Sequence, residues 1–486
     1  RPGSLIDLTV TRQDLAPPDE FPFTEHACIT SFPILEDILL IRGETNALKF
    51  AGLGAGDNMQ SEGALYWERE HPEIYKWEPM EQAPADFAPA LCIGDATATW
   101  EGETRNYLQV LGDYFGLDAP ARELAGNLVK NASGESGKVF RLAGYVQTNC
   151  AYKALEFGRR ARLPHKTAEI LHNHYGDCKD HALLLQQMLE ASGIPARLAL
   201  VRTQGKVRKE LPTLDQFDHM IVYLPAFQNG FFIDCTDKGS DLSQAVPLGL
   251  AGKEALILDA ANPRFVVIPD YPAGCNVFNS RREVRITNGT DVAVHEVLSL
   301  KGCGGSQLRA FFKGLQPEAR RNFVELQLNR QSGAVTSFEL ENLEDTQAPL
   351  VLDMDYILKR QFHLTGNQLV GKLPDVWEQV YAAAEPVELR TTPFELSFPI
   401  EVESTILLAI PQGCREPALE DFRQNVQTAF ATGRSEARKE GAGLQIDYRL
   451  QRRAGKFTAA EYGPYQDDMV KALGPLEQVV AFTKTP

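Results

Sequence analysis

Short stretches of alternating hydrophobic and polar residues dominate the first part of the chain and predict β-strands. These strand-like stretches lie at 5–11, 27–31 and 37–41. A Pro/Ala-rich stretch at 81–90 is typical of a linker. We therefore expect a β-rich N-terminal domain over residues 1–92.

Hydrophobic residues recur every three to four positions after about residue 100, which predicts helices. The expected helices lie at 106–115, 122–129, 138–161, 166–172 and 179–191. Three strand-like stretches follow at 197–201, 220–224 and 231–234. Helices followed by an antiparallel sheet indicate an α+β module, which we place at residues 93–270.

Strand-like patterns return after residue 271 and continue to the end of the chain. They lie at 283–286, 293–300, 350–358 and 479–482. An amphipathic segment at 308–328 interrupts them, and residues 462–473 have a helical pattern. We expect a β-rich, sandwich-like C-terminal domain over residues 271–486, so that the helical module lies between two β-rich regions.

Composition and charge narrow the class of protein. The 486 residues are 43% hydrophobic and 23% charged, as in an ordinary globular protein, which excludes a mainly disordered or collagen-like chain. Lys and Arg number 49 against 65 Asp and Glu, so the net charge is −16. This charge disfavours binding to nucleic acid or to anionic membranes. No apolar run approaches the ~18 residues of a membrane-spanning helix, so we expect no integral membrane segment.

The eight cysteines are scattered without a C-x-x-C motif, so we predict neither a disulfide framework nor a cysteine-rich zinc fold. One of them, Cys178, follows Gly176 and Asp177 at the predicted start of a helix. Free N–H groups and the helix dipole at such a position favour a thiolate and can hold an oxyanion. The acidic neighbours Asp177 and Asp180 oppose the thiolate, so a cationic partner is required. A buried structural cysteine is the alternative interpretation.

A cysteine nucleophile needs a base, usually histidine, and often a third group that orients the base. His219 and Asp234 lie in consecutive predicted strands that are separated by residues 225–230. A six-residue loop sets Asp234 diagonally to His219, and a four-residue loop sets the two directly opposite, so that both registers keep them on one face. A tight Asn229-Gly230 turn instead separates them along the strands, so the triad interpretation requires a longer loop. Taken alone, His219 is equally well a strand histidine and Asp234 a turn former.

This order of residues resembles the transglutaminase-like superfamily. The resemblance rests on Tyr152, Pro164, Tyr175-Gly176-Asp177-Cys178-Lys179-Asp180, Gly193-Ile194-Pro195-Ala196, Leu211-Pro212, Phe217-Asp218-His219 and Asp234-Cys235-Thr236. It is closer still to bacterial two-domain proteins that join this module to a β-rich region of the DUF3857 type. The N-terminal region resembles an incomplete copy of that β-rich region.

The resemblance implies a papain-like fold with Cys178 as nucleophile, His219 as base and acid, and Asp234 as the orienting group. Enzymes of this kind attack a carboxamide or peptide carbonyl, form a thioester, and pass the acyl group to an amine or to water. A second oxyanion donor lies upstream of the cysteine, and Gln147 and Tyr152 are the candidates. The resemblance also implies no cofactor, a protein or peptide substrate, and a periplasmic or secreted bacterial location.

Two other interpretations stay open. The module could be a catalytically inactive transglutaminase-like scaffold that binds a protein partner through its β-rich domains. His172, His174, Cys178 and His181 lie within ten residues and could form a zinc site, although their spacing matches no familiar zinc motif. The sequence does not separate a transferase from a protease, because both form the same thioester, and it leaves the oligomeric state open.

Overall fold

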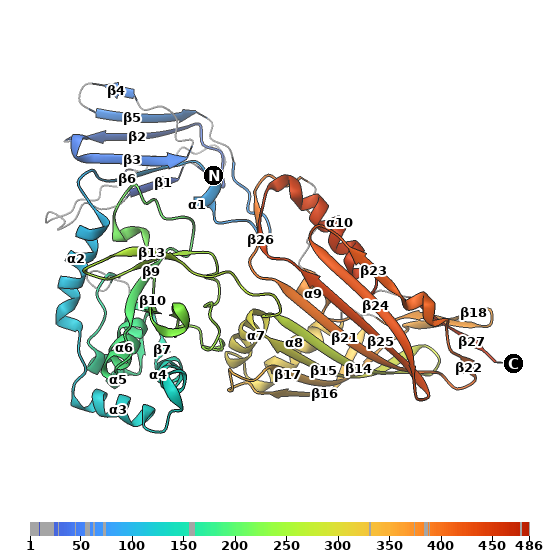
Figure 1. Ribbon diagram of the computed structural model, residues 1–486. Coiled ribbons are helices and arrows are strands. Elements are labelled where there is room, and N and C mark those ends of the chain that lie inside the picture. The colour runs from blue at the N-terminus through green and yellow to red at the C-terminus, as the bar shows by residue number, and fades with distance from the viewer. Residues whose placement is uncertain are drawn as a thin grey trace.

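The structure is a computed structural model of the chain. It describes residues 9, 24–27, 29–43, 45–53, 59–61, 64–70, 74–154, 161–329, 332–373, 375–382, 387, 389–476 and 479–485. Figure 1 shows three regions in chain order: blue strands, a cyan-to-green region of helices and strands, and a yellow-to-red region built on long strands. The fold is therefore α+β, as expected, with β-rich regions on both sides of the helical part.

The described part of the N-terminal region contains two small sheets. Its strands are β1 (Thr24–Ala27), β2 (Glu36–Arg42), β3 (Leu48–Leu53), β4 (Met59–Ser61), β5 (Ala64–Glu70) and β6 (Ala90–Asp95). One sheet has the order β1-β6-β3 and the other β2-β5-β4, and Leu65 and Trp67 of β5 pack with Leu91 and Ile93 of β6. The strand predicted at 37–41 lies within β2. The strand predicted at 27–31 is wrong, because β1 covers Thr24–Ala27 instead, and 5–11 lies outside the described residues.

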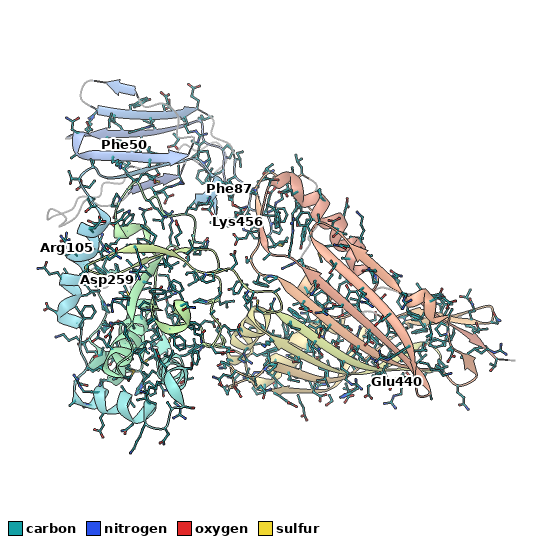
Figure 2. All side chains as sticks on the ribbon, viewed as in Figure 1. Phe50, Phe87, Arg105, Asp259, Glu440 and Lys456 are labelled. Carbon is teal, nitrogen blue, oxygen red and sulfur yellow. The ribbon has the colours of Figure 1, made fainter. Side chains whose placement is uncertain are left out.

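The predicted linker at 81–90 packs against the C-terminal region. It contains helix α1 (Pro84–Phe87) and the start of β6, so the boundary predicted after residue 92 falls inside a strand. Gln82 donates from Nε2 to the backbone carbonyls of Phe394 and Phe457. Lys456 Nζ lies 3.1 Å from the carboxylate of Asp86, and Figure 2 labels Lys456 close to Phe87 of α1.

The central region packs helices against one face of an antiparallel sheet. Its helices are α2 (Trp100–Leu111), α3 (Ala119–Val129), α4 (Gly134–Asn149), α5 (Thr167–Asn173) and α6 (Cys178–Ala191). The sheet has the order β11-β10-β9-β12-β13 and is formed by β9 (Arg197–Val201), β10 (His219–Leu224), β11 (Phe231–Ile233), β12 (Glu254–Ile257) and β13 (Arg264–Val267). Leu185 and Leu189 of α6 share one core with Met220 and Val222 of β10. Val246, Leu250 and Ile268 pack against the opposite face of the sheet.

The helix predicted at 138–161 is wrong in its second half. α4 ends at Asn149, and β7 (Ala151–Tyr152) runs parallel to β8 (Tyr175–Gly176), directly before α6. The N–H of Ala151 donates to the carbonyl of His174 at 2.8 Å, and the N–H of Lys153 donates to that of Gly176 at 2.9 Å. These bonds replace the next turn of a helix and hold the chain beside the start of α6. Residues 155–160 of the prediction lie outside the described part of the chain.

The hairpin of β10 and β11 has the six-residue loop. Leu224 pairs with Phe231, and Val222 pairs with Ile233. A 3-10 turn at Phe227–Asn229 fills the loop, and Gln228 and Asn229 both have a positive φ. Asn229-Gly230 is therefore not a two-residue turn, and the register is the one that sets Asp234 diagonally to His219.

The C-terminal region is built on an eight-stranded sheet of order β16-β17-β15-β14-β21-β25-β24-β23, in which only the contact of β14 with β21 is parallel. Its strands are β14 (Val277–Thr287), β15 (Asp291–Lys301), β16 (Gly333–Glu341), β17 (Leu350–Leu358), β21 (Ile400–Ala409), β23 (Gln424–Gln427), β24 (Ala431–Glu440) and β25 (Gly443–Arg452). Two smaller sheets use β18 (Phe362–Thr365), β19 (Gln368–Lys372), β22 (Cys414–Arg415) and β27 (Val479–Lys484), and β20 (Phe394–Leu396) with β26 (Gly455–Phe457).

Four helices accompany these sheets: α7 (Cys303–Lys313), α8 (Pro317–Asn329), α9 (Glu378–Ala382) and α10 (Tyr462–Leu473). The amphipathic segment at 308–328 is thus split between two helices, because α7 ends before Gly314 and Pro317 begins α8. The strand at 350–358 and the helix at 462–473 have the predicted bounds, and Figure 1 shows α10 lying along β24. Within the described ranges, no helix is both long and apolar enough to span a bilayer.

Candidate active site

Cys178 is the first residue of α6, and Asp177 is the N-cap residue. The carboxylate of Asp177 accepts from the N–H of Asp180, and the carboxylate of Asp180 accepts from the N–H of Asp177, which is a capping box. Among the described residues, the N–H of Cys178 has no hydrogen-bond acceptor. The helix start therefore leaves a backbone donor and the positive end of the helix dipole beside the thiol.

Gly176 allows the chain to approach α6 closely. A Cβ atom at position 176 would lie 2.4 Å from the Cβ of Asp180. Asp180 is fully buried, accepts from the N–H of His165 at 2.6 Å, and lies 3.0 Å from Nδ1 of the same histidine. Lys179 is also buried and forms an ion pair with Asp177. The G-D-C-K-D run is therefore a compact structural unit that presents the thiol at its centre.

His219 and Asp234 form the second part of the site. His219 Nε2 lies 2.7 Å from Asp234 Oδ2, and Asp234 Oδ1 accepts from the N–H of Thr236 at 2.9 Å and from its hydroxyl at 2.7 Å. Because Nε2 faces Asp234, Nδ1 is the ring nitrogen left for Cys178, which lies near enough to raise the pKa of His219. The structure thus brings together Cys178, His219 and Asp234, which the sequence had placed on a helix start and two strands.

The contact between His219 and Asp234 determines the charge that each of them carries. Burial lowers the pKa of His219, but the charge of Asp234 and the hydrogen bonds to Asp234 and Cys178 outweigh burial and raise the pKa to about 10. Burial raises the pKa of Asp234, but the charge of His219 and the hydrogen bonds from His219 and Thr236 outweigh it, so that this pKa is lowered. At neutral pH the two groups are an imidazolium and a carboxylate. An imidazolium beside a thiol favours the thiolate, so His219 is the cationic partner that Asp177 and Asp180 made necessary.

The described residues do not form the alternative zinc site at His172, His174, Cys178 and His181. In the part of the chain that the structure describes, no three His, Cys, Asp or Glu side chains are arranged to hold a metal ion. Burial and the charge of Lys238 lower the pKa of His181. Its Nδ1 lies 2.8 Å from the carbonyl oxygen of Asp177, and its Nε2 lies 3.0 Å from that of Cys150 and 3.1 Å from Lys238 Nζ. His181 therefore serves as a buried structural residue, and His172 and His174 are exposed at the end of α5.

The two candidates for the second oxyanion donor lie in different surroundings. Gln147 is buried in α4, and its amide nitrogen donates to the carbonyls of Asp237 at 2.7 Å and Ser240 at 2.8 Å. Both of its N–H groups therefore have backbone acceptors. Tyr152 pairs with Gly176 in the β7–β8 ladder, its side chain is 45% exposed, and its ring centroid lies 6.1 Å from that of His181. Of the two, only Tyr152 reaches the protein surface beside the start of α6.

Two further residues of the central region had no signal in the sequence. Lys238 Nζ donates to the carbonyls of Cys150 at 2.6 Å and Cys235 at 3.1 Å. The hydroxyl of Tyr107 in α2 donates to the carbonyl of Arg162 at 2.7 Å, and burial together with the charge of Cys178 raises the pKa of Tyr107. Both side chains are placed by tertiary packing, so no local pattern identifies them.

A cysteine at a helix start, beside a histidine and an aspartate on an adjoining antiparallel sheet, is the arrangement found in papain-like cysteine enzymes. Part of this chain is a transglutaminase-like domain. Residues 122–223 match the model of the transglutaminase-like superfamily, a range that includes Cys178 and His219 and ends before Asp234. The resemblance of the N-terminal region to the DUF3857 type stays a prediction.

The solved structures that align with the chain include the following two. A protein of Parabacteroides distasonis, described as a "putative protease", aligns with a TM-score of 0.65 at 14% identity over 96% of this chain and 76% of that chain. A protein of Cytophaga hutchinsonii, described as a "putative cysteine protease", aligns with a TM-score of 0.23 at 12% identity over 51% of this chain and 78% of that chain. No curated protein sequence matches the chain. The first alignment shows that the fold of nearly the whole chain occurs in another protein.

Proposed function

We propose that Cys178 is the nucleophile of an enzyme that transfers or hydrolyses the acyl group of an amide in a protein or peptide. The observation that carries this proposal is the contact of His219 with Asp234 at 2.7 Å on one side and with Cys178 on the other. That arrangement supplies a nucleophile, a proton carrier and an orienting carboxylate, which are the three groups that covalent catalysis by cysteine requires.

The first half of the reaction forms a thioester. The sulfur of Cys178 attacks the carbonyl carbon, and the carbon–oxygen double bond becomes an oxyanion that the N–H of Cys178 stabilises. His219 gives its Nδ1 proton to the departing nitrogen, the carbon–nitrogen bond breaks, and the amine leaves. Asp234 holds the imidazole through Nε2, so the ring keeps its orientation when it becomes neutral.

The second half regenerates the enzyme. Neutral His219 accepts a proton from an incoming water or amine, which attacks the thioester carbonyl and displaces the sulfur of Cys178. Water gives a carboxylic acid and completes a hydrolysis, whereas an amine gives a new amide and completes a transfer. No step requires a metal or a cofactor beyond these side chains.

An inactive scaffold is the second candidate, and one observation favours it. Cys178 is only 6% exposed. A covered thiol reacts with a substrate only after the surrounding side chains move. Under this alternative the domain binds a protein partner and Cys178 has no chemical role.

Site-specific alkylation separates the two candidates. We would measure the rate of iodoacetamide modification at Cys178 by peptide mass spectrometry from pH 5 to pH 10, with half-buried Cys414 as the internal reference thiol. The enzyme proposal predicts that Cys178 reacts much faster than Cys414 at pH 6–7 and that His219→Ala abolishes this excess. His172→Ala is the matched control, since His172 is an exposed histidine on α5. If Cys178 reacts as slowly as Cys414 and His219→Ala does not change its alkylation rate, the scaffold interpretation is correct.

A substrate assay then separates the two reactions. A glutamine-containing peptide library is incubated with the protein and a labelled primary amine, and the products are analysed by mass spectrometry. Incorporation of the amine indicates a transferase, whereas new peptide termini, or glutamate in place of glutamine within the peptide, indicate a hydrolase. Cys178→Ala serves as the blank in both measurements.

A further inference from the structure

The loop that directly follows Asp234 is anchored inside the central region. Gln147 donates from Nε2 to the carbonyls of Asp237 and Ser240. Lys238 turns inward and donates to the carbonyls of Cys150 and Cys235. We call residues 235–241 the post-Asp234 loop. Its inner side is therefore held by the buried side chain of Gln147 and the half-buried side chain of Lys238, which also lies 3.1 Å from Nε2 of His181.

The outer side of the same loop is held by helix α7 of the C-terminal region. Arg309 Nη1 donates to the carbonyl of Gly239 at 3.1 Å, and Lys313 Nζ donates to the carbonyl of Lys238 at 3.1 Å. A Cβ atom at position 239 would lie 2.2 Å from the carbonyl oxygen of Ser306, so the loop and the helix are in backbone contact. Ser306, Arg309 and Lys313 lie on successive turns of α7. One face of α7 therefore packs directly against the post-Asp234 loop.

Arg309 joins the loop to the body of the C-terminal region. Its side chain is 3% exposed, and it also donates from Nη2 to the carbonyl of Ala348 at 2.6 Å and from Nε to that of Asn342 at 3.3 Å. Gly239 belongs to the post-Asp234 loop, and the other two acceptors belong to the connection between β16 and β17. A small cavity of about 50 Å³ is lined by residues of both regions, among them Asp234 and Arg309.

We propose that α7 positions the catalytic carboxylate, with Arg309 as the positioning residue, so that the C-terminal region is part of the active-site architecture. The inference rests on the proposed function. The loop sets the place of Thr236, whose N–H and hydroxyl hold Asp234 Oδ1 and leave Oδ2 for His219. When α7 leaves the loop, Asp234 loses this support and turns away from His219. Separation of the C-terminal region from the central region therefore switches the site off.

The test is the titration of His219 by NMR in the full-length protein, combined with the pH profile of Cys178 alkylation. Arg309→Met removes the three hydrogen bonds and keeps much of the side-chain volume. We expect the midpoint for His219 to fall by more than one pH unit and alkylation of Cys178 at pH 7 to slow at least tenfold. Arg309→Lys keeps one donor and the charge and should recover part of both. Arg321→Met is the matched control, because Arg321 also donates to a backbone carbonyl, that of Val335, but lies on α8 away from the loop.

The outcomes separate this inference from the proposed function. If wild-type Cys178 shows no reactivity that depends on His219, the proposed function and this inference both fail. If the wild type is reactive and Arg309→Met leaves both profiles unchanged, only the inference fails. Gly239→Ala provides a second variant, in which the added Cβ pushes the loop off α7 without removing a charge. This variant should lower the His219 midpoint as Arg309→Met does. A His219 titration and a Cys178 alkylation profile like those of Arg321→Met would overturn the inference.

Discussion

His219 and Asp234 meet diagonally across their hairpin. The pairing of β10 with β11 ends, at the end away from the loop, with Val222 opposite Ile233. Continued by one residue, this register places Asp234 opposite Ile221 and not opposite His219. The 2.7 Å contact of Nε2 with Oδ2 spans this offset. Thr236, which the register places opposite His219, supplies the two hydrogen bonds that hold the other carboxylate oxygen. The strand pairing therefore provides both the partner of the histidine and the group that holds this partner.

Asp234→Asn tests whether the negative charge of Asp234, and not the size of its side chain, raises the pKa of His219. The amide keeps the size of the side chain but removes the negative charge that raises the pKa of His219. We expect the His219 midpoint to fall toward the ordinary value of about 6.5 and Cys178 alkylation at pH 7 to slow by at least tenfold. An unchanged midpoint in the NMR titration of the variant would show that Asp234 does not set the charge of His219.

The stability of the protein should depend on pH through His219. The folded-state pKa, about 10, lies above the ordinary value of 6.5, so His219 contributes stability that is complete below pH 6.5 and is lost as the pH rises toward 10. Asp234 is ionised throughout this range, because its pKa is lowered. We expect the free energy of unfolding of the wild type to exceed that of His219→Gln most at pH 6, with a difference that shrinks steadily up to pH 10. Urea unfolding of both proteins at each pH measures this difference. A difference that grows with pH would contradict a raised pKa of His219 in the folded protein.

Much of this site could be predicted from the sequence, because its parts are local. The glycine before Cys178, the capping residue Asp177 and the apolar spacing of α6 all lie within one short segment. The hairpin register remained open, because it depends on positive φ values at Gln228 and Asn229 that the residue types do not require.

The features that the sequence missed depend on contacts between distant segments. α4 stops at Asn149 because the next residues pair with β8, which lies more than twenty residues further along the chain. Arg309 acts on a loop that follows Asp234 by only a few residues, but it belongs to another region of the fold. Its sequence surroundings are those of an ordinary amphipathic helix, so periodicity assigns it no role.

Gly176→Ala should disturb the start of α6. The new Cβ would lie 2.4 Å from the Cβ of Asp180 and 2.7 Å from Oδ2, and Asp180 is buried and held by His165. The overpacking should cost about 1–3 kcal/mol of unfolding free energy and should reduce the reactivity of Cys178, because the helix start must move. Urea unfolding and alkylation measure the two effects. Gly144→Ala is the control, since a Cβ at position 144 in α4 meets nothing within 4 Å and should be neutral or stabilising. Equal stability of the two variants would contradict the close approach.

Tyr152→Phe tests the second oxyanion donor, and it does so independently of the nucleophile. Iodoacetamide alkylation forms no oxyanion, whereas attack on an amide does. If the Tyr152 hydroxyl donates to the oxyanion, the variant should alkylate at Cys178 like the wild type but form the thioester about 10²-fold more slowly. Gln147→Met should behave differently, because both amide N–H groups of Gln147 already serve the loop after Asp234. Its loss should lower the unfolding free energy by about 1–3 kcal/mol, since two buried carbonyls lose their donors. An acylation rate that falls only in the glutamine variant would assign the oxyanion site to α4 instead of β7.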